Sequence, residues 1–196
     1  MSKKDPIKNI RQLLSDSSSF TREQIEDAVD EVNQYEFGIK KRFDSLSVFA
    51  TAFYAQTEEQ NFEATSQTFF DREYEAKGIE VESTYFIDAW DFRGNLTWTD
   101  AEISKDVNNP ALEGNTPRRQ ADWIWTITPE YVTDTWSVGA SLQGSTEYYV
   151  QDNNDLKQEG YNLVNLFATY WVNDQFSVSL NVNNATDEFS QSRCLE

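Results

Sequence analysis

The 196-residue sequence contains no histidine and only one cysteine, and these absences exclude several classes of site. Zinc sites built on histidine, the Ser-His-Asp triad and the Cys-His pair all require residues that the chain lacks. Cys194 has no second cysteine with which to form an internal disulfide, so cysteine usage does not indicate a redox compartment. We therefore expect no enzyme, with no catalytic residues, no metal site and no cofactor.

Basic residues are scarce relative to acidic ones. The chain has 16 Lys and Arg against 34 Asp and Glu, which gives a formal net charge of -18. Binding to nucleic acid depends on clustered cations that neutralise phosphates. We therefore expect no nucleic acid among the partners.

Long hydrophobic runs are missing as well. No segment approaches the ~18 consecutive apolar residues of a membrane helix, and the mean hydropathy is -0.69. The first residues carry charge but no apolar segment, so we expect no signal peptide. These absences leave room for a transmembrane β-barrel, whose strands alternate apolar and polar residues instead of forming runs. Aromatic residues make up 14% of the chain, and that excess favours a barrel.

The hydrophobic period divides the chain into two regions. Residues 1–33 have helical spacing, with Thr21 as a candidate N-cap. From residue 34 onward the period is two, as in the segment 90–98 (WDFRGNLTW). We predict a helical N-terminal segment over residues 1–33 and a partial β-barrel domain over residues 34–196.

The second region contains eight predicted strands. They lie near 34–43, 46–56, 74–87, 90–98, 121–131, 136–143, 161–172 and 176–183. Tight turns near 44–45, 88–89, 133–135 and 173–175 alternate with long polar loops near 57–73, 100–119 and 151–160. Antiparallel neighbours would place every tight turn at one edge and every long loop at the other, as in outer-membrane barrels. The predicted fold class is all-β, an antiparallel transmembrane β-barrel segment of about eight strands.

The placement of charges favours lipid on the apolar face. Over the six clearly alternating strands we assign one charge, Lys41, to the apolar face. The opposite face receives Glu36, Lys40, Arg42, Glu80, Glu82, Asp91, Arg93, Asp122, Glu130 and Glu147. A lysine on the lipid face costs about 2–4 kcal/mol at mid-bilayer but only about 0–1 kcal/mol near the interface. Lys41 lies three residues from the turn at 44–45, where that cost is small.

Aromatic residues cluster at the predicted strand ends and are expected to border a membrane. The candidates are Phe43, Tyr85, Trp90, Trp98, Tyr131, Trp136, Tyr148 and Phe176. Trp and Tyr favour the bilayer interface because an apolar ring carries a polar N–H or O–H group. From Trp90 to Trp98 the strand spans ~26 Å, or ~20 Å vertically after tilt. That height is close to the apolar band of a barrel.

Several segments, in a fixed order, resemble the barrel of TonB-dependent outer-membrane receptors. These segments are 32–43 (VNQYEFGIKKRF), 75–82 (EAKGIEVE), 94–101 (GNLTWTDA), 114–117 (GNTP) with 128–131 (TPEY), 160–165 (GYNLVN) and 180–187 (LNVNNATD). The resemblance covers about residues 32–190.

This resemblance implies a large barrel with an N-terminal plug that imports a scarce nutrient such as a ferric siderophore. Its setting would be the Gram-negative outer membrane, with lipid and lipopolysaccharide around it. We find no segment that resembles the family's plug, signal peptide or final strand. We therefore expect a C-terminal fragment that does not transport alone. The small-molecule cargo and the TonB complex are therefore expected partners of the intact receptor only.

Charged residues on the polar face are expected to form a solvated lattice in the barrel lumen. With a two-residue turn at 88–89, Glu82 would face Asn95 and lie diagonal to Arg93, within reach of an ion pair. Glu80 belongs to the same lattice. The acidic loop segments 57–75 and 152–155 are expected to be solvated, with weak Ca²⁺ binding as the minority interpretation.

Arg118 and Arg119 are candidate contacts to an anionic ligand or to lipopolysaccharide phosphate. The alternative is a plain charge at the edge of a loop.

Two alternatives remain open for the whole chain. One is a soluble all-β ligand-binding module, lipocalin-like or lectin-like, with its apolar face inward. The other is an eight-stranded barrel that closes on itself. Solubility without detergent would distinguish the first alternative from a membrane barrel.

Overall fold

The computed structural model of the chain describes residues 31–63 and 68–188. These ranges contain β1 (Glu31–Arg42), β2 (Leu46–Glu63), β3 (Thr68–Ile87), β4 (Trp90–Asp106), η1 (Pro110–Leu112), β5 (Trp123–Val132), β6 (Trp136–Ser145), β7 (Tyr148–Tyr149), β8 (Lys157–Gln158), β9 (Tyr161–Asn173) and β10 (Phe176–Val182). Among the described residues, no helix is long and apolar enough to cross a membrane.

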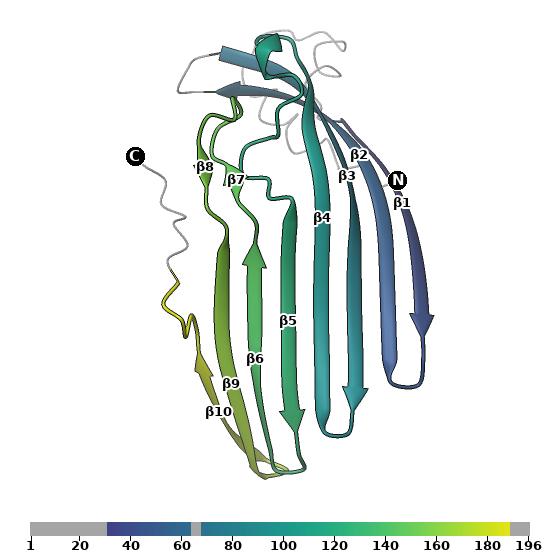
Figure 1. The fold of residues 1–196 in the computed structure, drawn as a ribbon, viewed down its shortest axis with the longest axis vertical. Helices are drawn as coiled ribbons and strands as arrows, with labels where there is room; N and C mark the ends of the chain where they lie inside the picture. Colours follow the sequence, from purple (N-terminus) through teal and green to yellow (C-terminus); the bar gives the residue numbers. More distant parts are fainter. Residues whose placement is uncertain (1–30, 64–67, 189–196) are drawn as a thin grey trace, which may run out of the picture.

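Eight of these strands form one antiparallel sheet, in the order β1-β2-β3-β4-β5-β6-β9-β10. Short turns join the strands at one end of this sheet and longer connections join them at the other (Figure 1). The remaining two strands, β7 and β8, form a small hairpin at the longer-loop end. The prediction of eight antiparallel strands is confirmed, and so is the sorting of loops by length for the connections 107–122 and 146–160.

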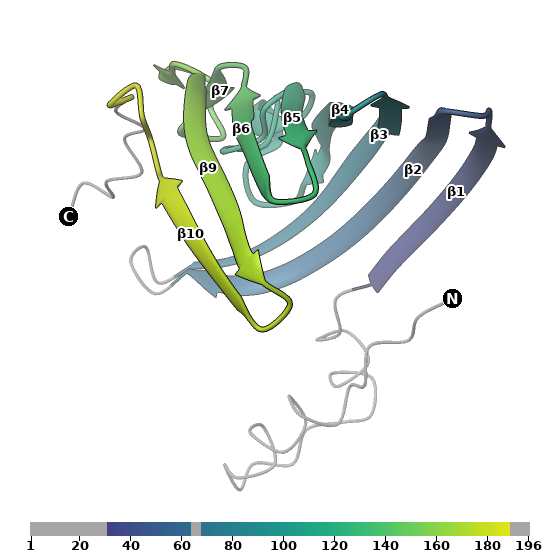
Figure 2. The same ribbon diagram turned by 90° about the horizontal axis from the view of Figure 1, so that it is seen from below.

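The sheet is curved but open. Figure 2 shows β1 and β10 at the two ends of the curved row of strands. In the part of the chain that the structure describes, these two strands pair only with β2 and β9 respectively. The eight strands therefore do not close on themselves. The alternative of an eight-stranded barrel that closes on itself is wrong for this structure.

Three strands extend further than the sequence predicts. The segments near 57–73 and 100–119 were expected to be loops, but β2 continues to Glu63, β3 begins at Thr68, and β4 continues to Asp106. The acidic composition of these segments is typical of a loop. However, the cross-strand hydrogen bonds of an antiparallel pair are made by the backbone, so the pairing continues through segments whose composition is typical of a loop.

The N-terminal prediction lies almost entirely outside the described residues. The helical segment over residues 1–33 overlaps the described structure only at 31–33, and these three residues belong to β1.

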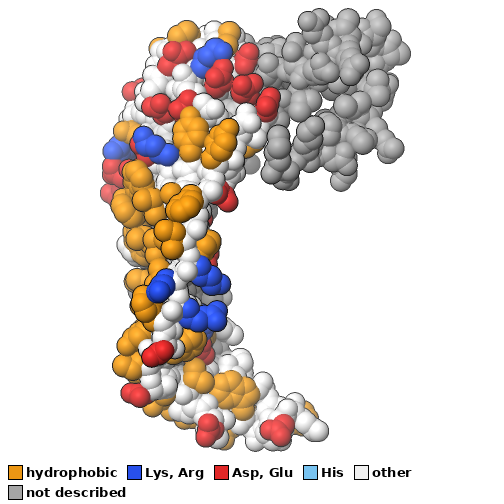
Figure 3. All heavy atoms as spheres, turned by 90° about the vertical axis from the view of Figure 1, so that its right-hand side faces the viewer, with side chains coloured by type: hydrophobic (Ala, Val, Ile, Leu, Met, Phe, Trp, Pro, Cys, Tyr) orange, Lys and Arg blue, Asp and Glu red, His pale blue; other side chains and the backbone are white. Residues whose placement is uncertain are grey.

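The two faces of the sheet differ in side-chain exposure. On the polar face, small residues are buried among larger neighbours, with Thr51 9% and Ser137 4% exposed. On the apolar face, side chains such as Ile127 and Val178 are exposed to solvent. Viewed from the β1 side, hydrophobic side chains gather along one flank of the sheet at mid-height, and acidic side chains concentrate near the upper end (Figure 3).

Aromatic rings on the polar face lie over glycines of the neighbouring strand. Phe53 is opposite Gly78, and Phe167 is opposite Gly139. A Cβ atom at Gly78 would lie 2.4 Å from the Phe53 ring and 2.3 Å from the carbonyl oxygen of Trp98. The ring occupies the space that a side chain would need, so glycine is required where these strands pack most closely.

We expect Gly78→Ala to lower the free energy of unfolding by about 1–3 kcal/mol, because the added methyl group meets backbone that cannot move aside. Urea unfolding of the chain in detergent micelles measures this change. Gly94→Ala is the matched control, since its nearest contact is the movable Ser83 hydroxyl at 3.2 Å. Equal effects of the two substitutions would contradict the packing argument.

Candidate functional site

A row of neighbouring aromatic rings lies at the short-turn end of the apolar face, and its rings are stacked except for Trp90 and Tyr131, which meet edge to face. Its ring centroids are 6.3 Å apart for Tyr85 and Phe92, 5.6 Å for Phe92 and Trp90, 5.1 Å for Trp90 and Tyr131, and 5.5 Å for Tyr131 and Trp136. Four of these five residues were candidates from the sequence. The register aligns β3, β4, β5 and β6 so that their rings meet side by side.

A second aromatic pair lies toward the other end of the same face. Trp98 and Trp123 are directly opposite in the ladder, with ring centroids 6.4 Å apart. Two residues further from the turns, Lys77 and Asp100 are also opposite, and their charged atoms are 3.0 Å apart. The apolar stretch of β3 and β4 thus ends at an aromatic pair followed by an ion pair.

This ion pair corrects the assignment of a single charge to the apolar face. Lys77 and Asp100 share that face with Lys41, because strand alternation continues past the aromatic pair. Each charge has a partner: Lys77 pairs with Asp100, and the Lys41 ammonium lies 5.6 Å from the centre of the Phe43 ring. The next pair of the same ladder on this face is Glu75 and Glu102, so the charges of the apolar face lie near the ends of the apolar stretch.

The other three aromatic candidates lie apart from the aromatic row. Phe43 follows β1 and Phe176 begins β10, and both rings are exposed at the short-turn end. Tyr148 lies in the β7–β8 hairpin, where its backbone is paired with Gln158 and forms a bridge with Ala121. The structure therefore places Tyr148 with the loops and not on a strand of the main sheet.

On the polar face, the structure confirms one predicted pairing and corrects another. Glu82 is opposite Asn95, as the two-residue turn at 88–89 predicts. Arg93, however, pairs with Glu130 (Nη2 to Oε2, 2.5 Å) and with Asp91 (Nε to Oδ2, 3.4 Å). The prediction of an ion pair between Arg93 and Glu82 is therefore wrong. Arg93 is diagonal to Glu82 on β3 and to Glu130 on β5. Glu130 and Asp91 both lie on the short-turn side of Arg93, whereas Glu82 lies alone on the other side. Glu80, opposite Thr97, is exposed in the same lattice.

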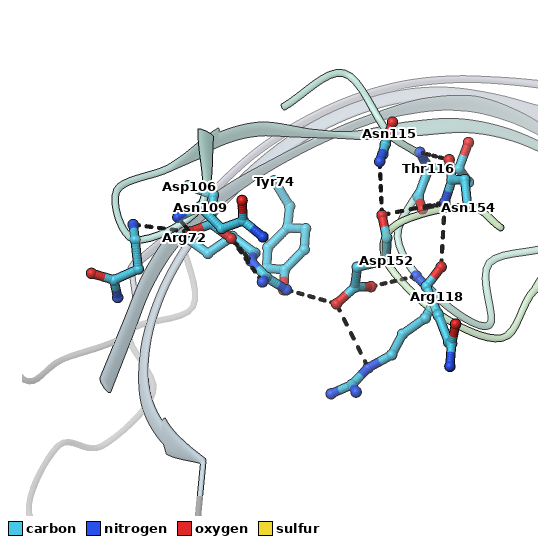
Figure 4. Close-up of polar contacts among 11 residues, drawn as sticks. Arg72, Tyr74, Asp106, Asn109, Asn115, Thr116, Arg118, Asp152 and Asn154 are labelled. Carbon is cyan, nitrogen blue, oxygen red and sulfur yellow. Dashed lines mark hydrogen bonds and ion pairs between the residues drawn. The ribbon is translucent and has the colours of Figure 1, made fainter. Parts of the chain in front are cut away.

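A buried ion cluster lies at the longer-loop end. The Arg72 guanidinium on β3 contacts the Asp106 carboxylate on β4 at 2.7 Å and the Asp152 carboxylate at 2.8 Å (Figure 4). Arg72 is 12% exposed, Asp106 1% and Asp152 14%. Because removal of charges from water is costly, such a cluster is stable only when further hydrogen bonds satisfy it.

Backbone amides donate some of these further hydrogen bonds to the Asp106 carboxylate. Its second carboxylate oxygen accepts hydrogen bonds from the amides of Asn108 (3.1 Å) and Asn109 (2.8 Å). Its own amide donates to the Glu113 carboxylate at 3.2 Å. Asp106 thereby fixes the start of the β4–β5 loop, residues 107–122.

Asp152 and Asn154 tie this loop to the β6–β9 loop, residues 146–160. The Asp152 carboxylate accepts the Arg118 amide (2.9 Å), and its carbonyl accepts the Asn115 side-chain amide (2.9 Å). Asn154 accepts the Thr116 amide at 2.9 Å and donates to the Thr116 carbonyl at 2.8 Å (Figure 4). The two loops are therefore joined to each other and, through Arg72, to the sheet.

Hydrogen bonding favours the charged form of Arg72. Burial by itself would lower the pKa of Arg72, but hydrogen bonds to Tyr74, Asp106 and Asp152 raise that pKa above its ordinary value. Burial raises the pKa of the Tyr74 hydroxyl. Arg72 is therefore charged, and Tyr74 protonated, throughout the physiological pH range.

The two predicted anion-contact residues have different surroundings. Arg118 is half exposed, and its Nε lies 4.0 Å from the Asp152 carboxylate. Arg119 has a left-handed backbone (φ 64°), and its amide donates to the Tyr149 carbonyl at 2.7 Å. Within the described ranges, no group of three or more Asp and Glu side chains is arranged to hold a metal ion.

The sequence did not single out Arg72, Asp106 or Asp152 as a cluster. One signal was present in the sequence, because Arg72 is the one cation in the acidic segment 57–75. Its partners, however, are 34 and 80 residues away. No local spacing rule connects residues so far apart.

The family model of the TonB dependent receptor-like β-barrel matches residues 31–185. Because this match covers most of the chain, the chain belongs to the TonB-dependent receptor β-barrel family. This is a family of receptors and not of enzymes. A soluble lipocalin-like or lectin-like module, the alternative considered from sequence, does not fit this membership.

Solved structures of receptors share the fold. The ferric yersiniabactin uptake receptor FyuA from Yersinia pestis has a TM-score of 0.68 and 19% identity, over 81% of this chain and 25% of the receptor. The siderophore receptor PiuA from Acinetobacter baumannii has a TM-score of 0.65 and 23% identity, over 80% and 24%. The ferric citrate transporter FecA has a TM-score of 0.70 and 15% identity, over 84% and 29%. The chain thus spans about a quarter of the length of these receptors. A comparison with curated proteins finds no match.

A double-mutant cycle tests the corrected ion pair on the polar face. We expect a coupling energy of about 0.2–1 kcal/mol between Arg93→Gln and Glu130→Gln, because Arg93 is half exposed. The cycle of Arg93→Gln with Glu82→Gln should show no coupling. Urea unfolding in micelles gives both values, and coupling to Glu82 alone would restore the pairing predicted from sequence.

Proposed function

We propose that the chain forms part of the wall of an outer-membrane receptor that takes up a scarce nutrient, such as a ferric siderophore, in a Gram-negative bacterium. The proposal combines the family membership with the siderophore and metal-chelate receptors that share the fold. The intact receptor would take its energy from the TonB complex. This chain contributes the wall, and we assign to it no transport by itself.

The observation that carries the proposal is the apolar stretch between two sets of aromatic residues on one face. The aromatic row from Tyr85 to Trp136 would lie at one bilayer interface, and the pair Trp98–Trp123 at the other. The eight residue steps from Trp90 to Trp98 match the height of a barrel's apolar band. The polar face, with Glu80, Glu82 and Arg93, would then line the lumen.

The two ends of the sheet would have different surroundings. In outer-membrane barrels the short turns are periplasmic and the long loops extracellular. The cluster around Arg72 would therefore lie outside the cell, at the mouth of the lumen. Arg118 and Arg119, on the loop 107–122, would be within reach of anionic ligands or of lipopolysaccharide phosphate.

Depth-dependent quenching of tryptophan fluorescence by brominated lipids tests the position of the apolar face. We expect single-tryptophan variants that retain Trp90 or Trp98 to be quenched most strongly by bromines near the headgroups, because both rings border the apolar stretch. Trp171 is the control, since it is opposite Ser177 on the polar face of β9. Equal quenching of Trp90 and Trp171 would contradict lipid on one face only.

A charge in the middle of the apolar stretch tests the same proposal through stability. Ile127 lies midway between Trp123 and Tyr131, so Ile127→Lys should cost about 2–4 kcal/mol of unfolding free energy in bilayers. Thr126→Lys places the same side chain on the polar face, beside Asn95 and Gln143, and should cost less than about 1 kcal/mol. Urea unfolding in lipid vesicles compares the two variants, and similar losses would argue against a membrane on the apolar face.

A further inference from the structure

The cluster around Arg72 joins three parts of the chain that are far apart in sequence. Arg72 belongs to β3, Asp106 ends β4, and Asp152 lies in the loop 146–160. The guanidinium donates from Nε to Asp106 and from Nη1 to Asp152, both at 2.8 Å. One side chain therefore makes charged hydrogen bonds to two loop-bearing segments at once.

The two loops are bound to each other by contacts in which Arg72 has no part. Asn154 exchanges two hydrogen bonds with the backbone of Thr116, and Asn115 donates to the Asp152 carbonyl. The Arg119 amide donates to the Tyr149 carbonyl, and Ala121 forms a backbone bridge with Tyr148. These contacts run along most of the facing parts of the two loops, so the loops form one body.

The connection of this body to β3 is narrower, and beside the ion cluster it includes a backbone hydrogen bond from the Val107 amide to the Asp71 carbonyl at 3.1 Å. Asp152 joins the loop 146–160 to Arg72, and Asp106 holds the beginning of the loop 107–122 beside the same guanidinium. The loop 107–122 also returns along β4, where the Ile103 and Gly114 amides donate to the carbonyls of Asn115 and Ile103. Arg72 is thus the charged contact that ties the joined loops to the neighbouring hairpin strand.

We propose that Arg72 is a positioning residue that anchors the loops 107–122 and 146–160 to β3 as a single body at the mouth of the lumen. Loss of this anchor would then loosen both loops together and not one of them alone. The proposal rests on the proposed function only in naming the mouth as the place where a ligand would enter. The coupling of the loops stands on their contacts alone.

Hydrogen exchange of the full chain in detergent micelles tests the anchor. The reporters are amides with assigned partners in the two loops: Thr116, Arg118 and Arg119 in one, Val150 and Asn154 in the other. With Arg72→Gln, we expect exchange in both loops to rise by about 10–100-fold, while β5 and β6 keep their protection. Lys105→Gln is the matched control, because it removes an exposed ion pair with Glu73 at the same end of the sheet and should change neither loop.

Two further variants keep the test decisive if Arg72→Gln disturbs folding. Asp152→Asn is nearly isosteric and leaves the pair of Arg72 with Asp106 in place, and it should also loosen both loops. Arg72→Lys keeps the charge but cannot bond both carboxylates with one fork, so its exchange should lie between wild type and Arg72→Gln. The double variant Arg72→Gln with Asp152→Asn should exchange no faster than Arg72→Gln alone, because the two residues act through one contact.

Each contrary result overturns the proposal. Loosening of one loop without the other would show that the loops are not one body. Unchanged protection in both loops would show that Arg72 does not anchor them, and lost protection in β5 and β6 would give Arg72 a role in the whole sheet instead. These outcomes are independent of tryptophan quenching, which tests the membrane position separately.

Discussion

The face on which each side chain lies depends on the antiparallel register, which is kept through seven strand pairs from β1 to β10. Since the side-chain period of a strand is two, a slip of one residue would move an entire apolar set to the polar face. The register shifts at Glu73/Tyr74 and Phe176/Ser177 lie at the two ends of the paired region, away from the middle of the apolar stretch. The sheet has almost no interior to compensate for a slip, because Ile103 and Ala121 are the buried hydrophobic residues among those described. Backbone pairing and cross-strand contacts therefore carry the stability.

The two ends of the sheet are stabilised by different interactions. At the short-turn end, neighbouring aromatic rings on β3 to β6 present apolar edges that suit contact with lipid. At the longer-loop end, buried charges and side-chain amides hold the loops, with Arg72 bonded to two carboxylates. Hydrogen bonds and ion pairs are directional, so they fix loop geometry in a way that apolar contact does not. In the receptor wall that we propose, the first end would border lipid and the second would hold the loops over the lumen.

Local patterns predicted the parts of the fold that local physics controls. The tight turns, with clear alternation in six of the strands, located all eight strands and the pairing of Glu82 with Asn95. Prediction was wrong for the acidic extensions of β2 and β3, which have the composition of loops but are paired as strands. It was also wrong for Arg93, because the choice between Glu82 and Glu130 depends on charges from both neighbouring strands. The residues of the aromatic row were predicted except for Phe92, whereas the contact between successive rings depends on the register.

By itself, the sequence determined the class of fold and the two faces of the sheet, because alternation and turn residues act over a few positions. The resemblance of several segments, in a fixed order, indicated the receptor family. The tertiary structure alone decided which side chains meet at the mouth. Arg72 is separated from Asp106 by 34 residues and from Asp152 by 80. Contacts over such distances arise only after hairpins with a common register bring their loop ends together, and no short-range pattern records them.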